Sequence, residues 1–319
     1  MKCVLVTGAT GFIGRAVCTA LDGNAHVRAT SRTVSADGPW DEAVRADLAR
    51  PLDGALVDGV DAILHCAGVA HAHGVALDDD AYFLAGNVAG ARRVCEAAAA
   101  AGVARVVLAS SVSVLGDGGP HAVEEDAVPA PSTAYARSKL ASEQFLLSVV
   151  AEPVVLRFPL VYGPGLPGNL ARMIDAVARR RFPPVPEVHN RRSMIHVQDA
   201  ARAMVLAASE SRAAGGTFTV TDGRTYSTHE IYRWILRAMG REAPRVTPPL
   251  FLFGALAGVG DVAGRLLHRR APFDGDAYRK LFGSAEFRSA RFPTLGFAPE
   301  WDLERAMPAV VAARESGAG

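Results

Sequence analysis

The chain has 319 residues, of which 50% are hydrophobic and 21% are charged. This length and composition predict a globular protein with one large domain or two closely packed domains. The formal net charge of +1, from 34 basic and 33 acidic side chains, argues against a protein that binds nucleic acid or a membrane surface through a basic face.

Short β-rich runs alternate with helical patterns through the first half of the chain. Strands are predicted at Cys3–Val6, His26–Thr30, Ala62–Cys66, Arg105–Ala109 and Val154–Arg157. Helices are predicted at Ile13–Leu21, Ala81–Ala101 and Ala134–Val150. Such alternation predicts parallel strands joined by right-handed crossovers, with helices on both faces of the sheet. The expected fold class is therefore α/β, with a doubly wound parallel sheet.

Loop-forming proline and glycine become frequent after Arg157, beginning with Gly163-Pro164-Gly165. We therefore expect a first domain over residues 1–162 and a smaller mixed lobe over residues 163–319. Segments near 191–208 and 217–221 are expected to return to the first sheet. Leu250–Val259 is apolar, but it is shorter than the roughly 18 residues that a spanning helix needs. It is interpreted as a helix or loop of the second lobe.

The cysteines and the amino terminus favour a cytoplasmic protein that lies outside the membrane. The run Cys3–Val6 reaches glycine at once, so we interpret it as a strand and not as an export signal. The cysteines lie far apart in apolar stretches, which favours reduced, buried thiols. They are Cys3, Cys18, Cys66 and Cys95. No grouping of His, Cys and acidic residues in the sequence has the spacing of a metal site.

A glycine-rich turn follows the first predicted strand and opens the first predicted helix. Its sequence is Thr7-Gly8-Ala9-Thr10-Gly11-Phe12-Ile13-Gly14. Glycine permits a tight turn, lets a pyrophosphate approach the amino end of the helix, and allows the helix to pack close to the strand. In this strand–turn–helix context the pattern predicts a dinucleotide site. The expected cofactor contacts from the turn are Gly8, Thr10, Gly11, Phe12 and Ile13.

Three residues are candidates for catalysis. Tyr135 and Lys139 are four residues apart in a predicted helix, so their side chains share one face about one turn apart. A tyrosine has a pKa of about 10, and a nearby ammonium stabilises its phenolate form. Ser111 ends a predicted strand, where ligands gather in doubly wound sheets. Ser111 can therefore donate a hydrogen bond to a substrate oxygen that Tyr135 protonates or deprotonates.

The glycine turn, the strand-end serine and the Tyr-x-x-x-Lys pair together resemble the extended short-chain dehydrogenase/reductase family. More narrowly, nearly the whole chain resembles the NAD-dependent epimerase/dehydratase family, in the branch of nucleotide-sugar 4-epimerases and UDP-4-keto-sugar reductases. The resemblance implies a Rossmann fold with a substrate lobe and an enzyme that uses NADP(H) or NAD(H). It also implies a nucleotide-sugar substrate, with a UDP-sugar favoured, and a homodimer formed through helices 81–101 and 134–150.

Further motifs carry this resemblance and imply further contacts. The motifs are Asp47-Leu48, His65-Cys66-Ala67-Gly68, Asn87, Arg157 to Pro164 and Arg192 to Asp199. Implied cofactor contacts are Asp47, Leu48, Ala67, Gly68, Asn87, Ser110, Tyr135, Lys139 and Pro159. Implied substrate contacts are His65, Ser111, Ser113, Asn169 and Arg192. Arg192 would hold a substrate phosphate, because a guanidinium fork matches phosphate geometry.

The choice of cofactor depends on the end of the second predicted strand. A carboxylate about 20 residues past the glycine turn would bind the ribose 2′-hydroxyl and favour NAD. This strand ends in Ala29-Thr30-Ser31-Arg32, which has no acid. Ser31 and Arg32 could receive a 2′-phosphate, so the sequence favours NADP(H) and leaves NAD(H) open.

Several reactions remain within the resemblance. Ser111-Val112-Ser113 stands where related dehydratases have Thr-Asp-Glu, which disfavours dehydration. Leu160 and Leu115 stand where 4-epimerases carry asparagine and tyrosine, which favours 4-keto reduction of a UDP-linked deoxy-amino sugar for surface polysaccharide biosynthesis. A UDP-hexose 4-epimerase with tightly bound NAD is the alternative. A reductase of a non-nucleotide ketone and a non-catalytic NAD(P)-sensing domain are further alternatives.

Overall fold

A computed structural model describes residues 1–70, 79–267 and 273–316 of the chain. Its larger sheet has seven strands in the order β3-β2-β1-β4-β5-β6-β9, and all their pairings are parallel. These strands are β1 (Cys3–Thr7), β2 (His26–Ser31), β3 (Glu42–Arg45), β4 (Ala62–His65), β5 (Arg105–Ser111), β6 (Glu152–Phe158) and β9 (Thr217–Thr219). The strand order reverses between β1 and β4, which is where ligands bind in sheets of this kind.

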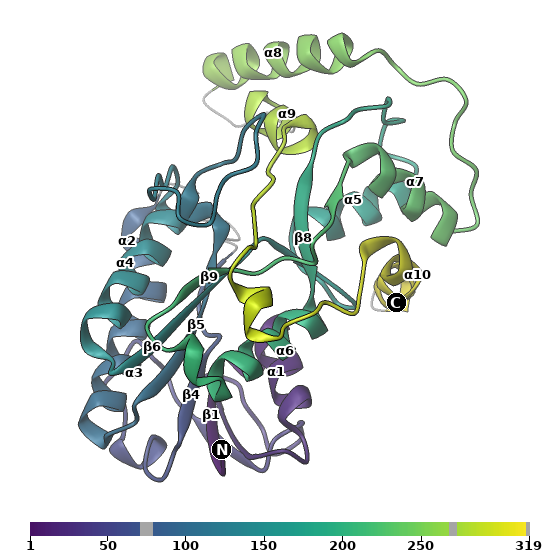
Figure 1. The fold of residues 1–319 in the computed structure, drawn as a ribbon. Coiled ribbons are helices and arrows are strands. Elements are labelled where there is room, and N and C mark those ends of the chain that lie inside the picture. Colours follow the sequence, from purple (N-terminus) through teal and green to yellow (C-terminus); the bar gives the residue numbers. More distant parts are fainter. Residues whose placement is uncertain (71–78, 268–272, 317–319) are drawn as a thin grey trace.

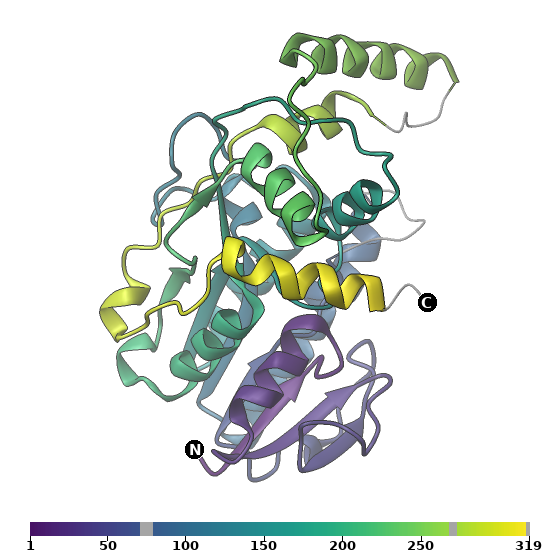
Figure 2. The same cartoon turned by 90° about the vertical axis from the view of Figure 1, so that its right-hand side faces the viewer.

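Helices cover both faces of the larger sheet, which confirms the predicted doubly wound α/β class (Figures 1 and 2). One face carries α1 (Phe12–Leu21) and α6 (Val197–Ser209), and the other carries α3 (Ala89–Ala101) and α4 (Ala134–Val149). Successive residues of β1 point to opposite faces. Val4 and Val6 accordingly belong to the core beneath α1 and α6, and Leu5 belongs to the core beneath α3 and α4.

The smaller lobe is built on a three-stranded mixed sheet in the order β10-β8-β7. Its strands are β7 (Leu160–Tyr162), β8 (Arg192–His196) and β10 (Thr225–Tyr226). Its helices are α5 (Asn169–Ala178), α7 (Thr228–Ala238), α8 (Leu250–Leu267), α9 (Gly275–Phe282) and α10 (Leu303–Ser316). Tyr162, Ile174 and Ile235 are buried at the centre of this lobe.

The segments expected to return to the larger sheet divide between the two lobes. Strand β8 pairs with β7 and β10 in the smaller sheet, whereas α6, which follows it directly, packs on the larger sheet. Strand β9 pairs with β6 at the edge of the larger sheet. The domain boundary at residue 162 stays a prediction.

Two further elements differ from the sequence-based expectation. The single helix predicted over 81–101 consists of α2 (Asp80–Phe83), a π-helical turn over Leu84–Val88, and α3. Strand β3 was not predicted, because its alternating pattern of half-buried and exposed residues is short and includes Glu42 and Arg45. It lies at the edge of the sheet, where one side of a strand faces solvent.

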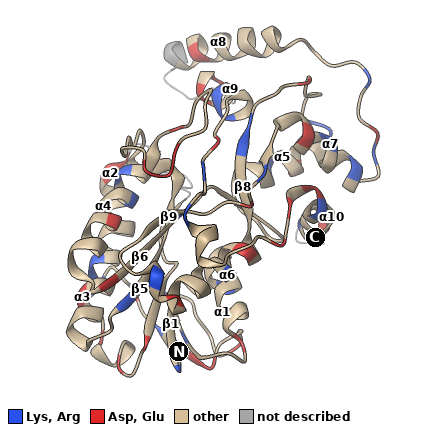
Figure 3. Cartoon of the chain, viewed as in Figure 1, with Lys and Arg blue, Asp and Glu red and all other residues tan. Residues whose placement is uncertain are grey.

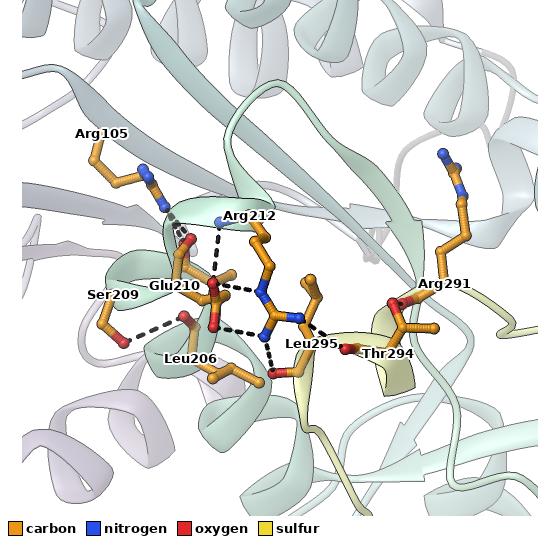
Figure 4. A network of polar contacts seen from close by, with 9 residues as sticks. Arg105, Leu206, Ser209, Glu210, Arg212, Arg291, Thr294 and Leu295 are labelled. Atoms are coloured by element: carbon orange, nitrogen blue, oxygen red, sulfur yellow. Dashed lines mark hydrogen bonds and ion pairs between the residues drawn. The ribbon is translucent and has the colours of Figure 1, made fainter.

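The segment before α10 is fastened to the end of α6 by polar contacts (Figure 4). Arg212 donates hydrogen bonds to the carboxylate of Glu210 and to the backbone carbonyls of Thr294 and Leu295. Arg105 of β5 reaches the same place and donates to the carbonyl of Glu210 at 3.0 Å. The carboxy-terminal segment is therefore held against the larger sheet before it returns to the smaller lobe.

Helix α8 lies at the outer end of the smaller lobe and carries few charges (Figure 3). It buries Phe253 and Ala257, but Phe251 is 70% exposed and Val259 is 65% exposed. The apolar segment that begins at Leu250 was expected to be a helix or a loop, and it is a helix. Among the described residues no helix is both long and apolar enough to cross a membrane.

Candidate active site

The glycine turn between β1 and α1 has the close contacts that its sequence predicts. Gly8 has a φ of +68°, and a Cβ placed on it would lie 2.6 Å from the Cα of Ala67. A Cβ on Gly14 would lie 2.1 Å from the carbonyl oxygen of Gly8. Residues with side chains do not fit at either position, so the strand, the turn and the helix meet at backbone distance.

The amino end of α1 is open to an anion. Gly11 is its N-cap residue, and no side chain among the described residues forms a capping hydrogen bond to this end. The first backbone N–H groups of a helix point outward and attract negative charge. The residues present therefore fit the diphosphate of a dinucleotide, which the turn and the helix end would hold through the backbone.

Ser111, at the end of β5, and Tyr135, in the first turn of α4, are brought together. The Ser111 hydroxyl lies near enough to the Tyr135 phenol to lower its pKa. Ser113 donates to the Ser111 hydroxyl oxygen twice, from its backbone N–H at 3.2 Å and from its own hydroxyl at 2.9 Å. The Ser111 hydroxyl proton is therefore left to point towards Tyr135 or towards a substrate oxygen. The rings of Phe83 and Tyr135 pack in a T-shaped arrangement, with their centroids 5.9 Å apart.

Lys139 lies one turn further along α4 and points inward. Its side chain is 7% exposed, and its Nζ donates a hydrogen bond to the backbone carbonyl of Ala109 at 2.7 Å. A Cβ on Gly68 would lie 3.7 Å from this Nζ, so the loop after β4 passes beside the lysine. The structure therefore brings Ser111, Tyr135 and Lys139 to one end of the sheet, as the sequence predicts for catalytic residues.

Burial shifts the pKa of both candidate catalytic groups on α4. It raises the pKa of Tyr135, and the neighbouring Ser111 hydroxyl opposes this. It lowers the pKa of Lys139 to about 8, against the opposing effect of the Glu143 carboxylate. A tyrosine that keeps its proton at neutral pH suits the role of a general acid.

Asn87 connects the loop after β4 to the catalytic helix. Its side chain accepts a hydrogen bond from the backbone N–H of Val69 at 2.7 Å and donates to the carbonyl of Val69 at 3.1 Å. It also donates to the Ser138 hydroxyl at 2.9 Å. The π-helical turn places Asn87 at this junction. Asn87 thereby fixes the position of Gly68 and Ala67, which stay predicted cofactor contacts.

Sequence reasoning missed a buried cluster behind the catalytic residues. Arg157 of β6 donates to both carboxylate oxygens of Glu143, at 3.1 Å and at 2.7 Å. Ser110 donates to the same carboxylate at 2.5 Å. The available signal was the spacing of Tyr135, Lys139 and Glu143, which repeats every four residues and places all three on one helical face.

His65 is the last residue of β4, and its side chain is buried, with 3% exposed. Its Nδ1 lies 2.7 Å from the Thr7 hydroxyl oxygen, and the two residues are register partners. Burial lowers its pKa to about 3, and the Lys139 cation adds to this effect. A direct contact between His65 and a substrate stays a prediction.

We expect His65 to make the folded protein sensitive to acid. Its pKa lies below the value of 6.5 that it has when exposed, so the unfolded chain takes up the proton first as pH falls. The free energy of unfolding should therefore be unaffected by this group above about pH 6.5 and should fall progressively towards pH 3. Urea unfolding across this range should show a shallower decline for His65→Gln than for the wild type. An equally steep decline would assign the acid sensitivity to other groups.

The remaining predicted cofactor residues lie along the same end of the larger sheet. Thr10 donates to the Ser31 hydroxyl at 3.0 Å, and Arg32 follows Ser31 at an exposed position. Asp47 and Leu48 follow β3. Pro159 is buried directly after β6, and Ile13 and Phe12 pack on the cores of the larger and smaller lobes.

A cavity of about 570 Å³ lies in the smaller lobe. Asn169 and Arg192, both predicted substrate contacts, line it. One terminal nitrogen of Arg192 donates to the backbone carbonyls of Gly283, at 3.0 Å, and Lys280. The cavity wall is mainly apolar. Apolar lining residues include Leu160, Leu170, Met173, Phe182, Ile231, Phe253, Leu256 and Phe273.

The fold and the site define a dinucleotide-binding enzyme of the extended short-chain dehydrogenase/reductase class. Residues 4–221 match the model of the NAD dependent epimerase/dehydratase family, and the chain belongs to that family. It is therefore an NAD(P)-dependent enzyme of the epimerase/dehydratase type.

Similar proteins include both epimerases and reductases. A UDP-glucose 4-epimerase of Vibrio cholerae is 28% identical, over 83% of this chain and 85% of its own length. A 4-hydroxy-2-methyl-3-oxo-4-farnesyl-3,4-dihydroquinoline-1-oxide ketoreductase of Stigmatella aurantiaca is 30% identical, over 84% of this chain and 83% of its own. Among solved structures, MoeE5 in complex with UDP-glucuronic acid and NAD is 25% identical with a TM-score of 0.77, covering 98% of this chain and 99% of its own.

Proposed function

We propose that the protein reduces the C4 ketone of a UDP-linked deoxy-amino sugar, as a step in the biosynthesis of a surface polysaccharide. The observation that carries this proposal is the position of Arg192, a half-buried cation that lines the substrate-lobe cavity. Among the described residues no carboxylate forms an ion pair with it. Burial lowers the pKa of Arg192, and an anionic ligand such as a diphosphate would compensate its charge.

The strand ends connect the catalytic residues to this cavity. Ser111 pairs in register with Phe158 of β6. Two residues further along the chain, Leu160 lines the cavity. A sugar whose C4 lies at Ser111 and Tyr135 would therefore extend its diphosphate towards Arg192. Asn169 lines the same cavity and offers amide donors and acceptors to the nucleoside diphosphate.

The chain's own residues supply the proton chemistry of the reduction. Tyr135 would donate its proton to the C4 oxygen, and Ser111 would donate a hydrogen bond to the same oxygen and polarise the ketone. Lys139 would stabilise the resulting phenolate with its positive charge and hold the ribose next to the nicotinamide. The bound nicotinamide cofactor supplies the hydride.

Two apolar side chains favour reduction over epimerisation. Leu115 is buried, and Leu160 lines the cavity, where related 4-epimerases carry a tyrosine and an asparagine. In an epimerase the 4-keto sugar must rotate within the site, so that the hydride returns to its opposite face. Apolar side chains at these two positions offer no hydrogen bonds to the rotated sugar. Their presence therefore favours an enzyme that reduces the ketone once and releases the product.

The end of β2 supports NADPH as the hydride donor. The strand ends in Ser31 and is followed by exposed Arg32, and this end has no carboxylate to bind a ribose 2′-hydroxyl. A guanidinium there would pair with the 2′-phosphate of NADPH. Arg32→Ala should raise the KM for NADPH and leave that for NADH nearly unchanged. Equal effects on both cofactors would show that Arg32 contacts only their common part.

A spectrophotometric assay with a UDP-4-keto-6-deoxy sugar tests the proposed activity. We expect the purified protein to oxidise NADPH in proportion to the sugar reduced, with NADH as a slower donor. Oxidation should require the nucleotide, so the free keto sugar should react far more slowly. Absence of turnover with every UDP-4-keto sugar tested would contradict the proposal.

Replacement of Arg192 tests the diphosphate site separately. Arg192→Met should raise the KM for the UDP-sugar roughly 10- to 100-fold and change kcat little, because a charge-assisted hydrogen bond contributes about 1.5–3 kcal/mol to binding. Arg191→Met is a matched control, since the Arg191 side chain is exposed and pairs with Glu286. An unchanged KM in Arg192→Met would place the diphosphate elsewhere.

UDP-hexose 4-epimerisation is the second candidate, and the similarity to the UDP-glucose 4-epimerase of Vibrio cholerae favours it. An epimerase returns the hydride from its own cofactor and needs that cofactor tightly bound. Denaturing freshly purified protein and quantifying the released dinucleotide separates the two activities. Stoichiometric NAD would favour the epimerase, whereas a largely empty site would favour the reductase.

The apolar lining of the cavity favours a further candidate, a reductase of a non-nucleotide ketone. The similarity to a ketoreductase of a farnesylated substrate agrees with such a lining. Assays with alkyl ketones in place of UDP-sugars decide between these substrates. A non-catalytic sensing domain is not favoured, because Tyr135 and Lys139 are both in place.

We also propose that the protein forms a homodimer through α3 and α4, which lie side by side on one face of the larger sheet. Leu147 and Val149 of α4 are exposed there and would be covered by the partner. Light scattering after size exclusion should give twice the chain mass, and Leu147→Glu should give a monomer. A monomeric wild type would contradict this proposal.

A further inference from the structure

We propose that Glu143 is a positioning residue of the reaction, whose buried carboxylate keeps Lys139 protonated and in place at the end of β5. This inference rests on the proposed function, because it concerns the same lysine. It goes beyond that function in assigning a role to a residue that would touch neither substrate nor cofactor.

Helix α4 and strand β5 meet through three consecutive contacts. Tyr135 lies beside Ser111, and Lys139 donates to the carbonyl of Ala109. Glu143 accepts from the hydroxyl of Ser110. Each of the last three residues of β5 thus contacts one residue of α4. The three contacted residues of α4 are spaced four positions apart and share one face of the helix. Glu143 is the third of these residues, and the other two, Tyr135 and Lys139, carry the proposed chemistry.

The Lys139 ammonium has no close carboxylate of its own. It is buried, and within the described part of the chain its Nζ donates only to the neutral carbonyl of Ala109. Burying an uncompensated charge disfavours the charged form. The groups that face Lys139 are Tyr135 on its own helix, His65 and Cys66 at the end of β4, and the carboxylate of Glu143. The Arg157 guanidinium of β6 pairs with that carboxylate.

Glu143 is built into a site that keeps its charge in a fixed position. Its side chain is 1% exposed, and Arg157 donates to both of its carboxylate oxygens. Ser110 and Arg157 are register partners on β5 and β6, so the two strands together form the site. The carboxylate opposes the loss of the Lys139 proton, which burial otherwise favours. A surface glutamate could not do this, because water would screen it.

The charge of Glu143 should affect turnover at alkaline pH. As pH rises, Lys139 loses its proton, and the phenolate that forms on Tyr135 loses its stabilising cation. With Glu143 present this occurs at higher pH than it would without that carboxylate. Removal of the charge should therefore shift the alkaline limb of the turnover profile downwards and should spare turnover at lower pH, where Lys139 is protonated in any case.

The test compares the pH profiles of kcat for the wild type and Glu143→Gln. We expect the alkaline limb to move down by roughly one pH unit. Because Glu143→Gln leaves the Arg157 cation buried without a partner, it can fail to fold. The double variant E143Q/R157Q removes both charges. We expect it to fold and to show a smaller shift in the same direction, because it also removes the Arg157 cation, which repels the Lys139 ammonium. Glu143→Asp keeps the charge and should keep the wild-type profile.

Glu152→Gln is a matched control at the other end of the same two strands. Glu152 pairs with the buried guanidinium of Arg105, and these two residues are also register partners on β6 and β5. The control removes a half-exposed carboxylate that pairs with a buried guanidinium far from Lys139, and it should leave the pH profile unchanged. A wild-type profile in folded E143Q or E143Q/R157Q, or an equal shift in E152Q, would overturn the proposal.

A measurement without substrate separates this inference from the proposed function. The affinity of the wild type for NADPH, measured by fluorescence titration, should fall as Lys139 loses its proton at alkaline pH. In E143Q/R157Q this fall should begin at a lower pH than in the wild type. Failure of the wild type to reduce any keto sugar would overturn the proposed function alone. Identical binding profiles in the two proteins would overturn the role of Glu143 alone.

Discussion

Tyr135→Phe is expected to fold, to bind its cofactor and to lose roughly 10²- to 10⁴-fold in kcat, which is the usual contribution of a general acid. The phenol is the group that would donate the proton to the C4 oxygen, and phenylalanine has no proton to give. The ring itself should stay in place, because it packs against Phe83. The neighbouring Ser111 hydroxyl should also stay in place, because Ser113 donates a hydrogen bond to it.

The loss should appear in kcat and not in the affinity for cofactor. Steady-state kinetics and a fluorescence titration with NADPH measure the two separately. Tyr82→Phe is a suitable control, since Tyr82 is a half-exposed tyrosine of the neighbouring helix α2. Turnover of Tyr135→Phe within a few fold of the wild type would remove Tyr135 from the role of proton donor.

Gly14→Ala is expected to have the second large effect, on both stability and cofactor binding. The added methyl group would lie 2.1 Å from the carbonyl oxygen of Gly8, which is backbone and cannot rotate away. Helix α1 would have to move off β1, and overpacking of this kind costs about 1–3 kcal/mol or more. The displaced helix end could no longer direct its N–H groups at a diphosphate.

Thermal unfolding and NADPH titration measure these two effects. Gly54→Ala is the matched control, because a Cβ on Gly54 meets no described atom within 4 Å and its backbone is not in the left-handed region. The control should unfold and bind like the wild type. A Gly14→Ala variant with an unchanged Tm and unchanged NADPH affinity would show that the close contact at Gly14 is not required.

The main features of the larger sheet could be predicted from the sequence because they depend on local patterns. Alternating strands and helices, the glycine turn and the Tyr135–Lys139 spacing each follow from neighbouring residues in the chain. The edge formed by β3 was harder to predict, whereas the segment of β9 was expected to return to this sheet and pairs with β6. Strand β3 has four residues, and the charged Glu42 and Arg45 stand at its two ends. Such a short strand is defined by the neighbour with which it pairs.

The candidate site was predicted only in part for a related reason. Glu143 was missed because a glutamate in a helix is usually exposed, and only the register of Ser110 with Arg157 shows that it is buried. The π-helical turn at Asn87 was missed because its stability comes from contacts with Val69 and Ser138, which are distant in sequence. The cavity likewise depends on how α8 and α9 pack beside β8, which residue types do not specify.

Transfer of a labelled hydride tests the central claim most directly. The protein is incubated with NADPH that carries deuterium at the transferable position of the nicotinamide and with a UDP-4-keto-6-deoxy sugar, and the product is analysed by mass spectrometry and NMR. The account predicts a UDP-sugar with one deuterium at C4, formed by the wild type and almost absent with Tyr135→Phe. A product without deuterium at C4, or one formed equally by Tyr135→Phe, would contradict it.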